Sequence, residues 1–297
     1  MPMNENNKID RAMAETLLKR RDPFAHKGSY GTVLVIAGSV GMAGAAVLCA
    51  RGALRSGAGL VRVSILPELF PIMQTAVPEA VCRPRTLDRK ELSGYSAIVA
   101  GPGLGVDFDE GPIRNVLECS GGIVLLDADC LNRMAVNRQL QDRVKEAKGT
   151  VILTPHPGEA ARLLRCTAMD INRDRPGAAR MLAEQTGAII VLKGAGTIVT
   201  APSQEIYINT TGNPGMATGG TGDVLAGIIG GLAAQGLTGI NAALAGVFIH
   251  GLAGDLGAAA LGEYGLVASD VAAMTGRAIM EIAGNQIRQQ EVGNEKE

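Results

Sequence analysis

The chain has 297 residues, 46% hydrophobic and 19% charged, which is typical of a globular protein that buries a core without disulfides or bound metals. Its 28 basic residues nearly balance its 29 acidic ones, so the charge argues against binding to nucleic acid or to an anionic membrane. The absence of Trp, with only four Phe and four Tyr, also argues against a base-stacking platform.

The N-terminal arm, residues 1–25, is polar and charged and lacks the apolar segment of a signal peptide. The five cysteines are scattered, odd in number and without a CxxC pair, which indicates free thiols in a reducing compartment. We therefore predict a cytoplasmic protein.

Seven short runs rich in β-branched residues predict strands, because each ends at Gly, Pro or a polar residue. They are Thr32–Ala37, Leu60–Ile65, Ala97–Ala100, Ile123–Leu126, Val151–Leu153, Ala188–Leu192 and Thr197–Thr200. Helical stretches lie between most of them, as in Met42–Ser56, Ile113–Glu118, Glu159–Arg165 and Arg175–Thr186. This alternation predicts an α/β fold with a mostly parallel central sheet between two layers of helices.

After about residue 196 the chain no longer alternates strands with helices. Gly196–Ala201 and Glu205–Asn209 predict a hairpin, and from about residue 219 the chain is mostly helical. The apolar stretch Ala242–Gly262 is interrupted by His250 and Asp255, so we interpret it as a buried helix and not a membrane span. No linker divides residues 1–297, which predicts one α/β/α domain, and the polar residues 286–297 are expected to fray.

The turns after the predicted strands carry the polar and glycine-rich motifs. In open α/β sheets, ligands bind beyond the carboxyl ends of the strands. Five such turns therefore predict a functional cleft at this edge of the sheet: Gly38–Gly44, Gly101–Gly105, Asp127–Asp129, Thr154–Glu159 and Lys193–Thr197.

A further glycine-rich turn, GGTGD at residues 219–223, precedes an apolar helix. Glycines expose backbone amides and a helix N-terminus carries partial positive charge, so this turn predicts an anion site. It is not a P-loop, because the required lysine is missing. Asp223 either caps the helix or accepts the proton of a hydroxyl group that attacks phosphorus.

Other candidates also leave two interpretations open. His156, between two prolines, is a rigid ligand contact or a structural loop residue. Glu159 stabilises the start of a helix or holds a metal through water. Asp127 and Asp129 share these alternatives, and Lys193 either meets a phosphate or is solvated. His26 and His250 are interpreted as structural, and no zinc motif or GxSxG hydrolase elbow is present.

These motifs together resemble one family. HKGSYGTVLVIAGSVGMAGAA, GPGLG, LLDADCLN, LTPHPGEAARLL, VLKGAGTIV and NPGMATGGTGDVLAGIIGGLAAQG extend over roughly residues 26–236. The chain resembles the ADP/ATP-dependent NAD(P)H-hydrate dehydratases of the ribokinase-like superfamily. The resemblance implies a three-layer α/β/α ribokinase-like domain with its active site at the strand ends.

The resemblance also implies a reaction. The (S)-epimer of hydrated NADH or NADPH is dehydrated at the expense of ADP, with release of AMP and phosphate. Asp223 deprotonates the ring hydroxyl, the terminal phosphoryl group of ADP moves to that oxygen with the help of Mg²⁺ and the Gly219–Gly222 amides, and phosphate is then eliminated. The choice of ADP over ATP follows bacterial members of the family and no residue of the chain.

Carried over position by position, the resemblance assigns three groups of residues. Those expected at the hydrated dinucleotide are Ala43, Gly103, Gly105, His156 and Asp223. Those expected at the adenine nucleotide are Lys193, Gly194, Ala195, Gly196, Thr197, Gly219, Gly220, Thr221 and Gly222. Glu159 is assigned to Mg²⁺ through water.

The resemblance further implies a homo-oligomer, namely a tetramer, and a separate NAD(P)H-hydrate epimerase as functional partner. Two alternatives share the GTGD motif. One is a small-molecule kinase of the same superfamily that acts on a vitamin-precursor or sugar-like alcohol. The other is a non-catalytic nucleotide-binding protein, against which the intact Asp223 argues.

Overall fold

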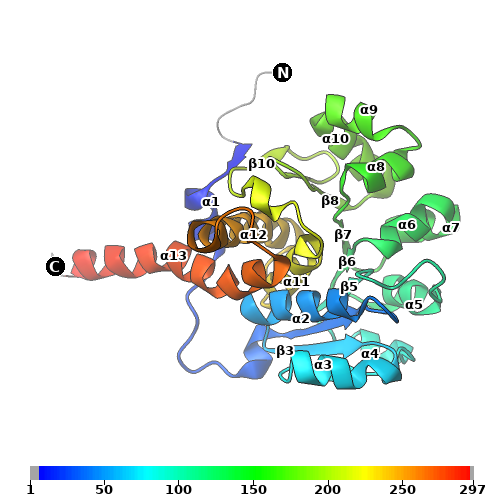
Figure 1. The fold of residues 1–297 in the computed structure, drawn as a ribbon, viewed down its shortest axis with the longest axis horizontal. Helices are drawn as coiled ribbons and strands as arrows, with labels where there is room; N and C mark the ends of the chain where they lie inside the picture. Colours follow the sequence, from blue (N-terminus) through cyan, green and yellow to red (C-terminus); the bar gives the residue numbers. More distant parts are fainter. Residues whose placement is uncertain (1–6, 295–297) are drawn as a thin grey trace.

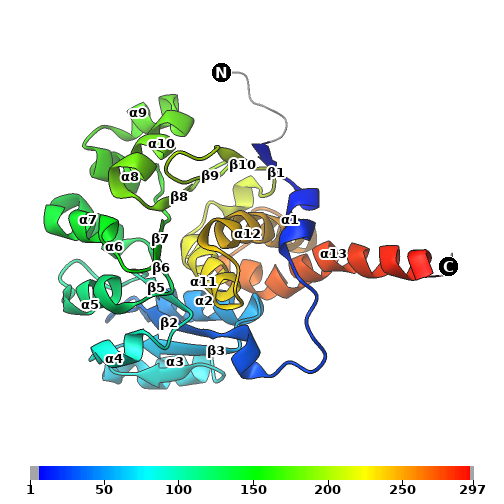
Figure 2. The ribbon, with the colours of Figure 1, turned by 180° about the vertical axis from the view of Figure 1, so that it is seen from behind.

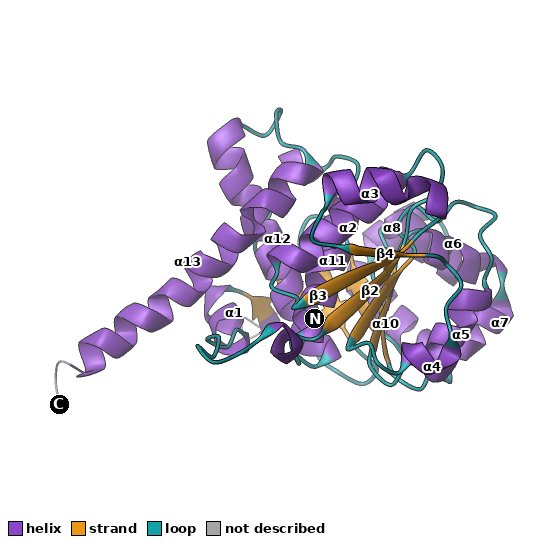
Figure 3. Cartoon of the chain, turned by 90° about the horizontal axis from the view of Figure 1, so that it is seen from below, coloured by secondary structure: helices purple, strands orange, loops and turns teal. Residues whose placement is uncertain are grey.

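The structure is a computed structural model that describes residues 7–294. Its strands form one sheet. Figure 3 shows this sheet between helices. The strands of this described part are β1 (Lys8–Ile9), β2 (Thr32–Ile36), β3 (Leu60–Ser64), β4 (Val81–Arg83), β5 (Ala97–Ala100), β6 (Ile123–Leu126), β7 (Thr150–Leu153), β8 (Ile189–Leu192), β9 (Ile198–Thr200) and β10 (Tyr207–Asn209).

The strand order is β1-β10-β9-β8-β7-β6-β5-β2-β3-β4. Strand β9 is antiparallel to both its neighbours, and every other neighbouring pair is parallel. The predicted hairpin is confirmed, since Tyr207 in β10 pairs with Val199 in β9. The carboxyl ends of β2, β5, β6, β7 and β8 therefore lie along one edge of the sheet.

Helices cover both faces of the sheet, as Figure 1 shows. Their bounds are α1 (Arg11–Leu17), α2 (Ala43–Arg55), α3 (Phe70–Ala76), α4 (Arg89–Leu92), α5 (Gly111–Cys119), α6 (Asp129–Val136), α7 (Arg138–Lys145), α8 (Pro157–Leu164), α9 (Ala168–Arg173), α10 (Arg175–Thr186), α11 (Thr221–Ala234), α12 (Gly239–Leu261) and α13 (Ala268–Asn294), with short 3₁₀ turns at Lys27–Tyr30, Pro67–Leu69 and Pro214–Met216.

Alternating strand residues enter two separate cores. Val33 and Val35 of β2 belong to the core under α1–α3 and α11–α13, whereas Leu34 and Ile36 belong to the core under α4–α10. This period of two is what a strand buried on both faces requires. The predicted three-layer α/β/α arrangement is confirmed.

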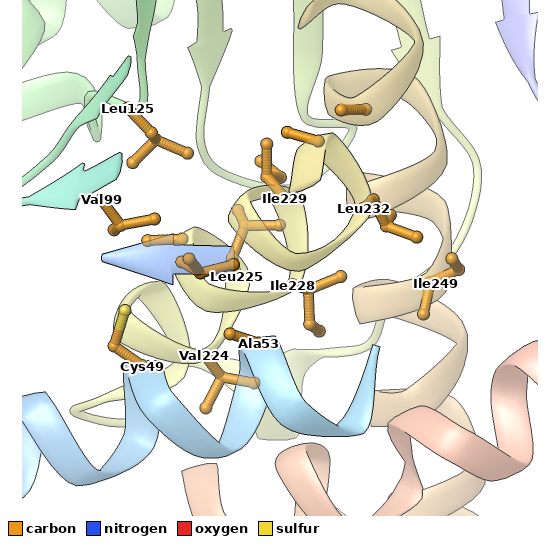
Figure 4. Packing of buried hydrophobic residues seen from close by; sticks show 14 of the residues in the cluster. Cys49, Ala53, Val99, Leu125, Val224, Leu225, Ile228, Ile229, Leu232 and Ile249 are labelled. Atoms are coloured by element: carbon orange, nitrogen blue, oxygen red, sulfur yellow. The ribbon is translucent and has the colours of Figure 1, made fainter. Parts of the chain in front are cut away.

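Helix α11 lies against α2 in the first of these cores, where Figure 4 shows Val224 and Ile228 near Cys49 and Ala53. A glycine allows this approach, because a Cβ at Gly227 would overlap the carbonyl oxygen of Cys49. The same helix carries GTGD at its N-terminus, so its packing fixes where Asp223 lies.

Helix α12 is long and apolar enough to cross a membrane by length and composition. However, 56% of its most apolar window is buried in the protein. It contacts α11, α13 and α1, and Figure 2 shows α1 beside it. The interpretation of this stretch as a buried helix fits that packing.

The two ends of the chain add elements that the sequence patterns did not predict. Within the arm, β1 pairs with β10 at the edge of the sheet and α1 follows it. At the other end, α13 continues to Asn294, through most of the segment that was expected to fray. Residues 1–6 and 295–297 of these two predicted segments lie outside the described part.

Candidate active site

The start of helix α11 shows that Asp223 does not cap it. The N-cap is Gly220, whose φ of 93° lies in the left-handed region, and Asp223 stands in the first turn. Among the described residues, none donates a hydrogen bond to its half-buried carboxylate. Burial, and next the charge of Asp127, raise the pKa of Asp223 to about 7, although Lys193 opposes the shift. The capping interpretation is therefore wrong, and the carboxylate is free to accept a proton near neutral pH.

Lys193, which follows β8, is not a solvated lysine. Its Nζ donates to Oδ1 of the buried Asp127 at 2.7 Å and lies 3.9 Å from Oε2 of Glu159. Burial alone would lower the pKa of Lys193, but the two carboxylates outweigh it and raise the pKa. A permanent positive charge is thus fixed beside Asp223, where it can meet a phosphate.

His156 and Glu159 cap α8 reciprocally. His156 Nδ1 accepts from the amide of Gly158 at 3.0 Å, while the His156 amide donates to Oε2 of the buried Glu159 at 2.7 Å. Burial first, and then Lys193, lower the pKa of His156, so the ring is neutral with its proton on Nε2. Burial raises the pKa of Glu159 to about 7. Both residues therefore have the structural role of capping α8, whereas the ligand contact of His156 and the metal role of Glu159 stay predictions.

Two glycine-rich turns meet beside these groups. The amide of Gly38 donates to the Pro102 carbonyl at 2.8 Å, and the amide of Gly105 donates to Oδ2 of Asp129 at 2.8 Å. Gly103, at φ 60°, has no room for a side chain, because a Cβ would lie 2.8 Å from Cβ of Ala45. The turns that carry Ala43, Gly103 and Gly105 are therefore packed together at the predicted edge.

A cavity of about 500 Å³ opens beside Lys193. Lys193–Thr197 line one side of it, and Thr221, Gly222 and His250 line another. The volume and the mixture of apolar walls with a few polar groups suit a small-molecule ligand. Gly219 and Gly220 lie outside this lining, so their assignment to a nucleotide stays a prediction.

Two residues of this site were missed by the sequence analysis. His250, interpreted as merely structural, lines the cavity from α12 and its Nε2 lies 2.9 Å from the carbonyl oxygen of Thr221. Burial lowers the pKa of His250 to about 4, so the ring is neutral and Nε2–H is the donor. The one signal in the sequence was an isolated histidine within an apolar helix.

Arg175, at the start of α10, is the second residue that the sequence patterns did not indicate. Its guanidinium donates to four carbonyl groups, one in the last residue of β8 and three in the loop after it, at 3.1–3.4 Å. The acceptors are Leu192, Lys193, Ala195 and Gly196. This one side chain therefore holds the wall of the cavity in shape, and nothing in the local sequence indicated it.

The family of the chain follows from comparison with known proteins. The family model described as NAD(P)H-hydrate dehydratase matches residues 33–275. The chain belongs to this family. The resemblance inferred from the motifs is confirmed, and the mostly parallel sheet between helices confirms the ribokinase-like architecture.

Three relatives are similar over most of the chain. An ADP-dependent (S)-NAD(P)H-hydrate dehydratase of Neisseria meningitidis is 39% identical, over 86% of this chain and 87% of its own length. A bifunctional NAD(P)H-hydrate repair enzyme of Coxiella burnetii is 47% identical over 86% of this chain. This chain spans only 51% of that relative's length. The crystal structure of an ADP/ATP-dependent NAD(P)H-hydrate dehydratase of Bacillus subtilis, co-crystallised with ATP and Mg²⁺, superposes with a TM-score of 0.82 at 32% identity, covering 93% of this chain and 98% of its own.

Proposed function

We propose that the chain removes water from the (S)-epimer of hydrated NADH or NADPH at the expense of ADP, as a hydro-lyase of nicotinamide nucleotide repair. The observation that carries the proposal is Asp223, a carboxylate with a pKa of about 7 beside the Lys193–Asp127 pair and the 500 Å³ cavity. A general base works best when its pKa lies near the operating pH. The name of the Neisseria relative supports the same reaction and the same nucleotide.

The first step is phosphoryl transfer. Asp223 takes the proton of the ring hydroxyl, whose oxygen attacks the terminal phosphorus of ADP. The oxygen–phosphorus bond forms as the bond from phosphorus to the bridging oxygen of AMP breaks, and AMP leaves. Lys193 and the amides at the start of α11 stabilise the charge on the transferred group.

The second step is elimination. The lone pair of the ring nitrogen expels phosphate from the neighbouring carbon, and loss of a ring proton restores the dihydronicotinamide. Phosphate is a far better leaving group than hydroxide, which is why the nucleotide is consumed. The neutral His156 and the turns with Ala43, Gly103 and Gly105 would orient the ring and the rest of the dinucleotide.

Mg²⁺ is proposed as the metal that neutralises the phosphate charge. Among the described residues there is no group of three or more His, Cys, Asp or Glu side chains that could hold a metal ion. Mg²⁺ often needs only one or two carboxylates, with water and substrate phosphates as the other ligands. We assign this role to Glu159, acting through water, because Oδ1 of Asp127 is already paired with Lys193 and Oε2 of Glu159 accepts only the His156 amide among the described residues.

We further propose that the protein is cytoplasmic, forms a homotetramer and works beside an NAD(P)H-hydrate epimerase. Near the turn between α12 and α13, Tyr264 is fully exposed and Leu261 and Val267 are about half exposed, and a subunit interface would cover these apolar side chains. The bifunctional names of longer relatives support a second repair activity. Light scattering at several concentrations would measure the assembly.

The direct test uses purified protein, chemically prepared NADH hydrate, Mg²⁺ and either ADP or ATP, and it follows the absorbance of restored NADH. Turnover with ADP, together with release of phosphate, is the expected result. Turnover with ATP alone would keep the reaction and overturn the choice of nucleotide. A stable phosphorylated product without NADH would instead identify a small-molecule kinase.

A further inference from the structure

A second cavity, of about 660 Å³, lies at the same edge of the sheet. Leu66 and Pro67 after β3, Pro84 and Arg85 after β4, and Leu104 and Phe108 after β5 line it. The first cavity is lined by residues that follow β8 and β10. In the strand order, β6 lies between these two groups, so Asp127 and its neighbour Asp223 stand between the two cavities.

Arg85 lines this second cavity and forms no ion pair with a carboxylate of the described residues. Its Nη2 donates to the carbonyl oxygens of Gly38 and, at 3.5 Å, Ala37, but Nη1 has no partner and Nε is buried without one among the described residues. No carboxylate of the described residues lies within 4.0 Å of it. Burial lowers the pKa of Arg85, and the charge of Glu68 only partly opposes this. A half-buried guanidinium without an ion-paired carboxylate favours an anionic ligand, and its Nη1 group is left to donate to a phosphate oxygen.

The remaining walls suit a nucleoside. Pro67, Pro84 and the buried Phe108 offer flat apolar surfaces against which a heterocyclic base can pack. Two exposed carboxylates, Asp107 and Asp109, lie in the same lining. Oδ1 of Asp109 is occupied by the amide of Gly111 at 2.9 Å, whereas Asp107 can accept from a ribose hydroxyl.

The cavity is connected to the turns expected at the dinucleotide. Leu104 belongs to the Gly101–Gly105 turn, and Arg85 holds the carbonyl of Gly38 in the Gly38–Gly44 turn. A dinucleotide whose nicotinamide reacts at Asp223 must place its other half elsewhere, and the first cavity is taken by ADP. We propose that the second cavity binds the adenosine half of the hydrated dinucleotide and that Arg85 contacts a phosphate of that half. The proposal rests on the proposed function.

The test uses a probe that lacks nicotinamide, adenosine 2′,5′-bisphosphate, as an inhibitor of the wild-type enzyme. We expect inhibition that is competitive with NADPH hydrate and not with ADP. Adenosine, without phosphate, should inhibit at least tenfold more weakly. Competition with ADP alone would place the probe in the first cavity and overturn the proposal.

A matched pair of variants tests Arg85 itself. Arg85→Gln should raise KM for NADPH hydrate and the inhibition constant of the bisphosphate about 10-fold to 100-fold, while KM for ADP and kcat stay within about twofold. Arg173→Gln, at an exposed arginine of α9, should change none of these. Unchanged inhibition of Arg85→Gln by the bisphosphate would overturn the proposal. Since turnover at saturating hydrate is measured in the same experiment, failure of the proposed reaction would be seen separately.

Discussion

Asp223, Lys193 and Asp127 come from three distant parts of the chain and work as one group of charges. Asp127 keeps Lys193 protonated, and Lys193 limits how far burial raises the pKa of Asp223. The sequence motifs indicated all three residues, because each follows a predicted strand or opens a helix at the edge where we predicted a ligand. Their pairing, and the contacts of His250 and Arg175 with backbone carbonyls far along the chain, depend on tertiary structure and leave no local pattern.

The first prediction concerns the base. Asp223→Asn should lower kcat by roughly 10²–10⁴, because the amide cannot accept the proton of the hydroxyl group. The Kd for ADP, measured by calorimetry, should change by less than about threefold. Asp142→Asn, at an exposed position on α7, is the control and should leave both values unchanged. A variant as active as wild type would contradict the assigned role of Asp223.

The second prediction concerns pH. Asp223 must be ionised to act, so kcat/KM should rise with pH and level off above its pKa of about 7. The free energy of unfolding should instead fall as pH rises. The folded pKa lies above the unfolded one, so the carboxyl group contributes stability that is fully present below about pH 4 and is lost as pH rises through about 7.

Asp223→Asn removes that penalty. The Tm of the variant, relative to wild type, should therefore be higher by a few degrees at pH 8 and nearly equal at pH 4, as measured by calorimetry across this range. A difference in Tm that shrinks as pH rises would contradict the buried-carboxylate account.

The third prediction concerns Arg175. Arg175→Gln should raise KM for ADP about tenfold, since four carbonyl groups at the end of β8 and in the loop after it lose their shared donor. It should leave kcat and KM for the hydrate nearly unchanged. Arg175→Lys should behave similarly, because an ammonium group lacks the planar fork. Arg180→Gln, exposed on the same helix, is the control. An equal rise in both KM values would indicate a general structural role instead.

At the scale of elements, the predictions succeeded for central strands buried on both faces and for helix α10, which Asp174 caps and Gly187 ends. The bounds of β5, β6 and α10 agree with the predicted segments, and α8 begins two residues early because His156 caps it. Strands β1 and β4 were missed, since one has two residues and both lie at sheet edges without a continuous apolar run. The order of the strands in the sheet could not be predicted from the sequence either, because it depends on how distant segments pack.

The fourth prediction concerns the contact of α11 with α2. Gly227→Ala should destabilise the protein by about 1–3 kcal/mol, because its Cβ meets the backbone of Cys49 and the helices must separate. Gly276→Ala, on the exposed side of α13 with open space around it, should stabilise by about 0.5–1 kcal/mol through helix propensity. Urea unfolding measures both, and equal effects of the two changes would contradict the close packing.

At the scale of the whole molecule, the first cavity lies between the sheet and the helical C-terminal part of the chain. The first cavity takes its lining from the loops after β8 and β10 and from α11 and α12, so a nucleotide there contacts both the sheet and the helical C-terminal part. Fold class, and the edge of the sheet where the first cavity lies, could be predicted because they follow from the alternation of strands and helices and from the strand ends. The two cavities could not be predicted from the sequence, because the residues of several separate segments line each of them.

The last prediction uses this arrangement. A ligand that binds only the folded state at 100 times its Kd adds about 2.7 kcal/mol, so ADP without hydrate should raise Tm by several degrees in a single transition. Asp223→Asn should keep the shift, because it loses chemistry and not binding, whereas Arg175→Gln should lose most of it. Differential scanning calorimetry gives all three values. Two separate transitions, only one of them moved by ADP, would show that the sheet and the helical part do not unfold together and that the nucleotide contacts only one of them.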